Sequence, residues 1–104
     1  MAKGYWVARV DIADLEAYQR YVRANAEPFR TWGARFLVRA GRFEAMEGAS
    51  RSRNVVLEFP SYDAAIGCYR SPEYQAALAM RLPPVASADL IVIEGYDGPQ
   101  PGDA

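Results

Sequence analysis

Three charged side chains stand where the chain otherwise has the composition of buried strands. Arg39, Glu58 and Glu94 each end or interrupt an apolar run. A charge in such a place must be paired or lie close to solvent, because an unpaired buried charge is costly. One interpretation is a pocket in which Arg39 holds an anionic substrate and a carboxylate acts as acid or base. The alternative is a set of ion pairs at strand ends or across a dimer.

A polar side chain also interrupts an apolar helical stripe. Tyr18, Val22 and Phe29 recur at helical spacing, and Asn25 lies on the same stripe. Its amide would then face the sheet, where burial costs free energy unless the amide is hydrogen-bonded. Asn25 is therefore a candidate ligand-binding residue, and the alternative is a paired structural amide near the helix end.

Two tyrosines flank an expected helix break. Tyr69 and Tyr74 stand on either side of Ser71 and Pro72, where a new helix would present free backbone N–H groups to an anion. The tyrosines could orient a ligand there or supply a proton, and the alternative is that both rings belong to the core. Cys68 has no histidine to activate it and is interpreted as a small core residue.

The complete absence of histidine restricts the possible chemistry. It excludes the usual Ser-His-Asp and Cys-His machinery and any zinc or haem held by histidine. One cysteine cannot build a zinc or iron–sulfur site either. We therefore expect no metal and no cofactor, and any chemistry must come from carboxylates, Arg, Tyr, Asn or the backbone.

Size and charge indicate one small soluble domain. The chain has 104 residues, with 12 basic and 13 acidic side chains interleaved. No basic face indicates nucleic-acid binding, and no apolar run approaches the ~20 residues that span a bilayer. The first residues lack a signal-peptide pattern. With a lone cysteine as well, we expect a cytoplasmic protein with neither a nucleic-acid nor a membrane partner.

The hydrophobic pattern predicts four strands. They are expected at residues 5–12, 35–40, 53–59 and 89–96. Residues 42–47 either extend the second strand or start a hairpin. Residues 1–96 should form the domain, and 97–104 a tail that crosses to a partner or is disordered.

Two helical stretches complete a βαββαβ order. The first is capped by Asp14 and ends by Gly33. The second is capped by Ser61, is interrupted where Ser71 caps a new segment, and stops near Leu82. This order predicts an α+β, ferredoxin-like fold with both helices on one face of an antiparallel sheet.

The strands predict a homodimer. An antiparallel sheet with one face in water should alternate apolar and polar residues. Residues 5–8, 55–57 and 90–93 are instead unbroken apolar runs. Because two helices cover only one face of the sheet, we expect a second copy to cover the other face, sheet against sheet. The alternative is a monomer with an unusually apolar sheet.

Five segments together resemble a known family, the domain of unknown function 1330 of the dimeric α+β barrel superfamily. They are residues 33–41, the pair Glu47-Gly48, and residues 56–61, 69–75 and 92–95. The likeness runs from about Tyr5 to Tyr96, although Ala40-Gly41 stands where the family often has two glycines. The resemblance implies two ferredoxin-like sheets packed as a dimeric barrel. It implies no activity, because the family has none assigned and a fold does not fix function.

The wider superfamily includes haem-degrading enzymes, chlorite dismutases, muconolactone isomerases and cofactor-free oxygenases. The haem enzymes use a histidine ligand, which this chain lacks. RNA-recognition domains share the βαββαβ order, but they need aromatic residues where this chain has Val55 and Leu57.

The leading hypothesis is a homodimer that binds a small organic acid or aromatic between sheet and helices. It acts either as a cofactor-independent isomerase or oxygenase, or as a non-catalytic metabolite-binding or protein-interaction dimer. A third reading is a structural dimer without a pocket. The candidate binding residues are Asn25, Arg39, Glu58, Tyr69, Tyr74 and Glu94.

Overall fold

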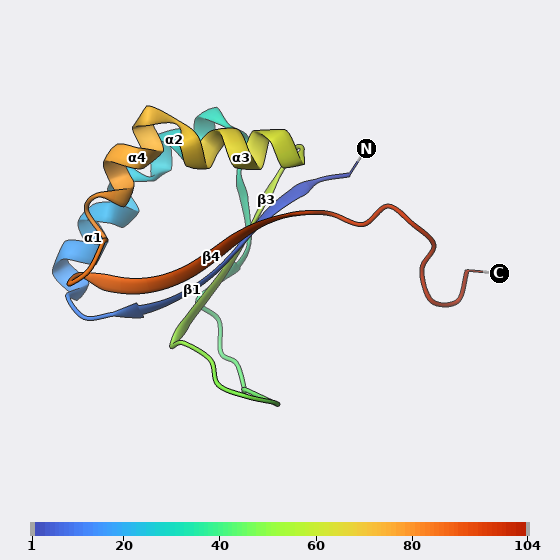
Figure 1. The fold of residues 1–104 in the computed structure, drawn as a ribbon, viewed down its shortest axis with the longest axis horizontal. Coiled ribbons are helices and arrows are strands. Elements are labelled where there is room, and N and C mark those ends of the chain that lie inside the picture. Colours follow the sequence, from blue (N-terminus) through green and yellow to red (C-terminus); the bar gives the residue numbers. More distant parts are fainter. Residues whose placement is uncertain (1, 104) are drawn as a thin grey trace.

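Four strands and four helices make up the computed structural model, which describes residues 2–103 (Figure 1). The elements are β1 (Gly4–Ile12), α1 (Leu15–Ala24), α2 (Ala26–Thr31), β2 (Arg35–Arg39), β3 (Arg53–Phe59), α3 (Tyr62–Arg70), α4 (Pro72–Leu78) and β4 (Ala86–Glu94). The strands form one sheet in the order β2-β3-β1-β4, with antiparallel neighbours throughout. All four helices cover the same face of the sheet (Figure 1). The predicted ferredoxin-like α+β fold is confirmed.

Local hydrogen bonds start three of the helices as expected. The side chains of Asp14, Ser61 and Ser71 each accept a hydrogen bond from the backbone N–H three residues further on. Each of these bonds satisfies a donor that would have no partner inside the helix. Pro72 occupies the first position of α4, where a missing N–H costs nothing. All three predicted caps are therefore confirmed.

The first helical stretch is two helices rather than one. α1 ends at Ala24 and α2 begins at Ala26, with Asn25 between them. The physical reason is Pro28, which has no N–H to bond the Ala24 carbonyl and whose ring crowds that carbonyl in a continuous helix. Pro28 is tolerated because it falls in the first turn of α2. Gly33 follows with a φ of 75°, which suits its predicted role after the helix end.

Three other boundaries differ from the prediction. β4 begins at Ala86 because its small residues pair with the end of β1, which compensates for their weak strand propensity. The segment after α4 leaves the helix at Leu78 and continues as turns up to β4. Residues 41–52 neither extend β2 nor form a hairpin, and they hang from the sheet on the side away from the helices (Figure 1).

An aromatic cluster centred on Trp6 fills the space between sheet and helices. The indole is 1% exposed, and its Nε1 donates to the Ala65 carbonyl at 2.8 Å. Edge-on and tilted rings surround it, contributed by Phe29, Phe59, Tyr69 and Tyr74. Cys68 is also buried in this core, and burial raises the pKa of its thiol to about 12. The thiol is therefore protonated and unreactive at neutral pH, as the sequence predicted.

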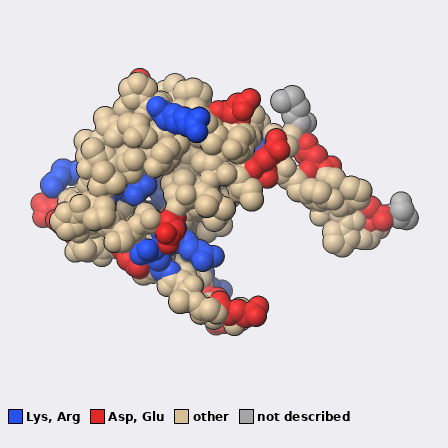
Figure 2. Space-filling view, in the orientation of Figure 1, with Lys and Arg blue, Asp and Glu red and all other residues tan. Residues whose placement is uncertain are grey.

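The other face of the sheet is uncovered in the single chain and is apolar at its centre. Val7 lies between Val56 and Ile91 in the strand register, and Ile93 follows on the same face. Ile91 is 56% exposed and Ile93 is 47% exposed. We call this surface the bare face. Residues 40–52 and the tail after β4 project beyond the sheet, and Figure 2 shows a hollow between them.

Among residues 2–103, no helix has the length and apolar character needed to cross a lipid bilayer.

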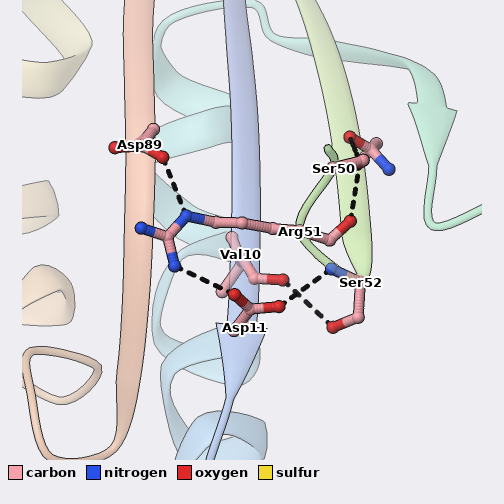
Figure 3. Close-up of polar contacts among 7 residues, drawn as sticks. Val10, Asp11, Ser50, Arg51, Ser52 and Asp89 are labelled. Carbon is pink, nitrogen blue, oxygen red and sulfur yellow. Dashed lines mark hydrogen bonds and ion pairs between the residues drawn. The ribbon is translucent and has the colours of Figure 1, made fainter. Parts of the chain in front are cut away.

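An ion cluster lies at one end of the bare face. Arg51 crosses β1 and donates from Nε to Asp89 at 2.8 Å and from Nη1 to Asp11 at 2.9 Å (Figure 3). The backbone N–H of Ser52 donates to the other oxygen of Asp11 at 2.9 Å. The cluster therefore fastens the segment before β3 onto β1 and β4. The Ser52 N–H, with smaller contributions from the Ser52 hydroxyl and Arg51, lowers the pKa of Asp11 below its ordinary value.

We predict that Asp11→Asn lowers the melting temperature at pH 7 and that this difference disappears in acid. A carboxylate whose pKa is lowered by folding stabilises the protein at every pH above the pKa of the same group in the unfolded chain, which is near 4. That contribution is lost as the pH falls through the pKa of Asp11 in the folded protein. Below that pH, the variant and the wild-type protein should have the same melting temperature. Calorimetry from pH 7 to pH 2 measures the difference, with Asp97→Asn in the tail as a charge control. A difference that stays constant over this range would contradict the assignment.

Candidate functional site

A small cavity lies between α1 and the helix-covered face of the sheet. It has a volume of about 40 Å³, and one water occupies roughly 10–15 Å³ on this measure. Its walls are mainly aromatic and aliphatic, from Trp6, Val10, Tyr18, Tyr21, Val22, Phe29, Phe36, Val55 and Leu57. Tyr18, Val22, Arg39 and Arg53 also line an adjoining surface groove of about 420 Å³. The cavity and the groove therefore share one wall, made by these four residues.

Three arginines from different parts of the chain line this cavity. Arg39 ends β2, Arg53 begins β3, and Arg81 follows α4. Each guanidinium lies over an aromatic ring of the site: Arg39 over Phe36 at 4.2 Å, Arg53 over Tyr18 at 5.6 Å and Arg81 over Tyr21 at 5.3 Å. The rings hold the charged groups against the wall through cation–π contacts.

Arg39 reaches the cavity because of an irregularity in β2. The pairing of β2 with β3 shifts register between Phe36 and Val38. With this extra residue, Phe36 pairs with Leu57 and Arg39 pairs with Val55, so both lie on the helix-covered face. Regular alternation would have put Phe36 and Arg39 on opposite faces. The bulge therefore turns Arg39 from the bare face into the site.

The positive charge of the cavity is uncompensated. No Asp or Glu of residues 2–103 lines it, and none of its three arginines forms an ion pair within that part of the chain. Arg81 is 7% exposed, and the buried Nε of Arg53 has no hydrogen-bond partner among the described residues. Guanidinium groups stay protonated in proteins, so the site carries three positive charges. It is electrostatically suited to an anion.

Polar uncharged groups lie beside the arginines. The hydroxyls of Tyr21 and Tyr74 are 2.8 Å apart, and Arg81 Nη2 donates to the Tyr74 hydroxyl at 3.4 Å. Burial raises the pKa of Tyr74 well above its ordinary value, so this phenol stays neutral. Asn25 is 7% exposed, lines the cavity, and makes no side-chain hydrogen bond within residues 2–103. The alternative interpretation, a paired structural amide, therefore finds no hydrogen-bond partner among the described residues.

The six residues singled out from the sequence divide into separate regions. Asn25 and Arg39 line the cavity, and Tyr74 lies directly behind Tyr21. Tyr69 packs on Trp6 and Tyr74 in the core and does not line the cavity.

The two carboxylates lie away from the arginine cavity. Glu58 is on the bare face, where it accepts a hydrogen bond from the Tyr5 hydroxyl at 3.3 Å. Glu94 borders an open hollow with Asp63 and Asp97 near the start of α3. The fold therefore does not join Arg39 to either carboxylate in one pocket, although a role for these two residues in another site stays a prediction.

Four residues that line the cavity were not predicted from the sequence, although the sequence contains signals for them. Arg53 alternates with Val55 and Leu57 and so shares their face of β3. Arg81 continues the buried spacing of Tyr74 and Leu78 beyond the helix end. Tyr18 and Tyr21 belong to the stripe that Asn25 completes, but spacing alone cannot distinguish a core ring from a pocket wall.

The described residues offer no obvious metal site. Within residues 2–103, no group of three or more His, Cys, Asp or Glu side chains is placed to hold a metal ion. The donors that line the cavity are guanidinium, phenol and amide groups. The guanidinium groups favour anions over cations, because they are permanently positive and have donors only.

The family model described as "Domain of unknown function (DUF1330)" matches residues 3–96. The chain belongs to this family. The match spans all four strands and all four helices of the DUF1330 domain and ends before the tail. No curated protein is significantly similar to the chain.

Solved structures share the fold at low sequence identity. The RPA0582 protein of unknown function from Rhodopseudomonas palustris is 21% identical with a TM-score of 0.71, covering 93% of this DUF1330 chain and 85% of its own. A dimeric ferredoxin-like protein of unknown function from Thermobifida fusca YX is 15% identical, with a TM-score of 0.58 and coverages of 88% and 90%. SnoaB, a cofactor-independent oxygenase from Streptomyces nogalater, is 11% identical, with a TM-score of 0.60 and coverages of 94% and 97%. These likenesses establish the fold alone.

Proposed function

We propose that this protein is a homodimer in which each subunit binds a small organic anion in the arginine cavity. The observation that carries the proposal is the convergence of Arg39, Arg53 and Arg81 on one cavity that no described carboxylate lines. Such an arrangement costs folding free energy when empty, because like charges repel and buried polar atoms lack partners. A bound carboxylate removes both costs. The aromatic walls accommodate its apolar body.

The dimer is the second part of the proposal. On the bare face Ile91 and Ile93 are exposed and Val7 and Val56 are half-buried, and strand register joins them into one apolar surface. A second copy covers this surface sheet against sheet, and residues 40–52 and the tail close around its edges. The similar structure from Thermobifida fusca is described as dimeric, which supports this arrangement. The cytoplasmic location stays a prediction.

Two functional classes remain for the bound anion. In the first, the protein is an isomerase or oxygenase without a cofactor, a reading supported by the fold it shares with SnoaB, itself a cofactor-independent oxygenase. In the second, it binds a metabolite or a partner protein without converting it. With Glu58 and Glu94 away from the arginine cavity, the candidate proton-transfer groups there are the tyrosines, which favours chemistry that needs no carboxylate base.

Matched pairs of anionic and neutral compounds test the anion site. We expect benzoate and butanoate at pH 7 to raise the melting temperature, and benzamide and butanamide to leave it unchanged. A ligand at 100 times its Kd should add about 2.7 kcal/mol to the free energy of unfolding. Mass spectrometry of the incubated compounds distinguishes turnover from simple binding. If amides and carboxylates stabilise the protein equally, or neither does up to 50 mM, the anion site is refuted.

A further inference from the structure

A chain of hydrogen bonds leads from Arg81 through Tyr74 to Tyr21 at the cavity wall. Arg81 Nη2 lies 3.4 Å from the Tyr74 hydroxyl, which lies 2.8 Å from the Tyr21 hydroxyl. Tyr74 is completely buried, so no solvent molecule exchanges with its hydroxyl from outside. Tyr21 lines the cavity, whereas Tyr74 does not.

The chemistry of these groups gives the chain a direction. A guanidinium has donors only, so the Tyr74 oxygen must accept the hydrogen bond from Arg81. The Tyr74 proton then has one hydrogen-bond acceptor among the described residues, the Tyr21 oxygen. The opposite direction would leave a buried hydroxyl proton without an acceptor. Tyr74 therefore donates to Tyr21, and the Tyr21 proton is left to point elsewhere.

The cavity offers more donors than one carboxylate can accept. Each guanidinium has five N–H donors, and an ionised carboxylate has about four lone-pair sites. Tyr21 adds a hydroxyl proton, and Asn25, between α1 and α2, adds an amide without a partner among residues 2–103. Arg39 and Arg53 line both the cavity and the outer groove, whereas Tyr21, Asn25 and Arg81 line the cavity only. A ligand whose carboxylate is bound by Arg39 and Arg53 can therefore place a second oxygen atom deeper in the cavity.

We propose that the ligand is an oxo-carboxylate, whose uncharged carbonyl oxygen accepts a hydrogen bond from the Tyr21 hydroxyl. Tyr21 is then a specificity-determining residue, and Tyr74 is a positioning residue that aims its proton. Hydrophobic walls at Trp6, Phe29 and Leu57 disfavour a fully hydrated anion such as inorganic phosphate. The inference rests on the proposed anion site and deepens it.

The test compares 2-oxobutanoate with butanoate, two monoanions at pH 7 that differ in the carbonyl group. Isothermal titration of the full-length protein should show 2-oxobutanoate binding about 5-fold more tightly, the value of one neutral hydrogen bond. Tyr21→Phe should abolish this preference without changing the affinity for butanoate. Tyr74→Phe should reduce the preference. On binding to this variant, the ¹³C resonance of the C2 carbonyl carbon of 2-oxobutanoate should shift less than it does on binding to the wild-type protein. Tyr62→Phe, at an exposed tyrosine of α3 that lines neither the cavity nor the outer groove, is the control and should change neither.

The outcomes separate this inference from the anion site itself. If both acids bind wild-type protein equally, or the preference survives in Tyr21→Phe, the role of Tyr21 is wrong while the anion site stands. Tighter binding of inorganic phosphate than of 2-oxobutanoate also overturns the oxo-carboxylate assignment. If none of the three anions binds at 50 mM, the proposed function fails and the inference fails with it.

Discussion

Ile91→Asp is expected to sediment as a single subunit of 11.5 kDa, whereas the wild-type protein should have twice that mass at micromolar concentration. Ile91 is 56% exposed in the single chain, next to Val7 on the bare face. An aspartate there is solvated in a free subunit but buried in a sheet-to-sheet dimer. The substitution therefore acts on association rather than on the fold of the subunit.

Symmetry doubles the effect. A two-fold interface contains every substitution twice, so two carboxylates become buried together. At about 3 kcal/mol for each unpaired buried charge, the two copies weaken the dimer by roughly four orders of magnitude. A dimer with nanomolar Kd would then dissociate at micromolar concentration.

An apolar residue exposed elsewhere provides the control. Leu82 is 48% exposed in the turns between α4 and β4 and is not on the bare face. Leu82→Asp should leave the mass unchanged. Analytical ultracentrifugation measures both variants, and far-UV circular dichroism checks that they are folded. A wild-type protein that sediments as a monomer, or an Ile91→Asp variant that stays dimeric, would refute the bare face as the subunit interface.

Arg53→Met should make the unliganded protein more stable and at the same time insensitive to carboxylates. The Nε of Arg53 is buried without a partner among the described residues, and no ion pair within them is lost on substitution. Methionine has a similar length and no polar atom to desolvate. An unsatisfied buried polar group costs about 1–3 kcal/mol. For a domain of this size, 1 kcal/mol shifts the melting temperature by about 4–8 °C.

The two halves of this result exclude a purely structural role. Replacing an arginine that stabilises the fold would lower the melting temperature. Replacing a binding arginine that destabilises the unliganded protein should instead raise the melting temperature. Arg20→Met is the control, because Arg20 is exposed on α1 and does not line the cavity. It should change neither the melting temperature nor the carboxylate-induced shift. A lower melting temperature for Arg53→Met, or an unchanged response to benzoate, would refute the proposed site.

The sequence alone predicted the features that depend on short-range chemistry. The caps at Asp14, Ser61 and Ser71 each bond a backbone group three residues away, so their residue types suffice to recognise them. The bounds of β3 follow from its composition in the same way. Pro28 carried an equally local signal for the break at Asn25, although the apolar stripe that runs through the break concealed it.

The arrangement of the candidate site depends on contacts between residues far apart in the sequence, which no local sequence pattern encodes. Arg39 and Arg81 are 42 positions apart in the sequence. They converge only because β2 carries a bulge and the chain leaves α4 by a turn next to Tyr21. Glu58 and Glu94 resembled Arg39 as charges in apolar strands, but strand register put Glu58 on the bare face and pairing put Glu94 at a strand end. The sequence by itself determined the elements, the family and the apolar surplus of the sheet. Only the tertiary structure decided which charges meet, because a one-residue shift in register exchanges the two faces of a strand.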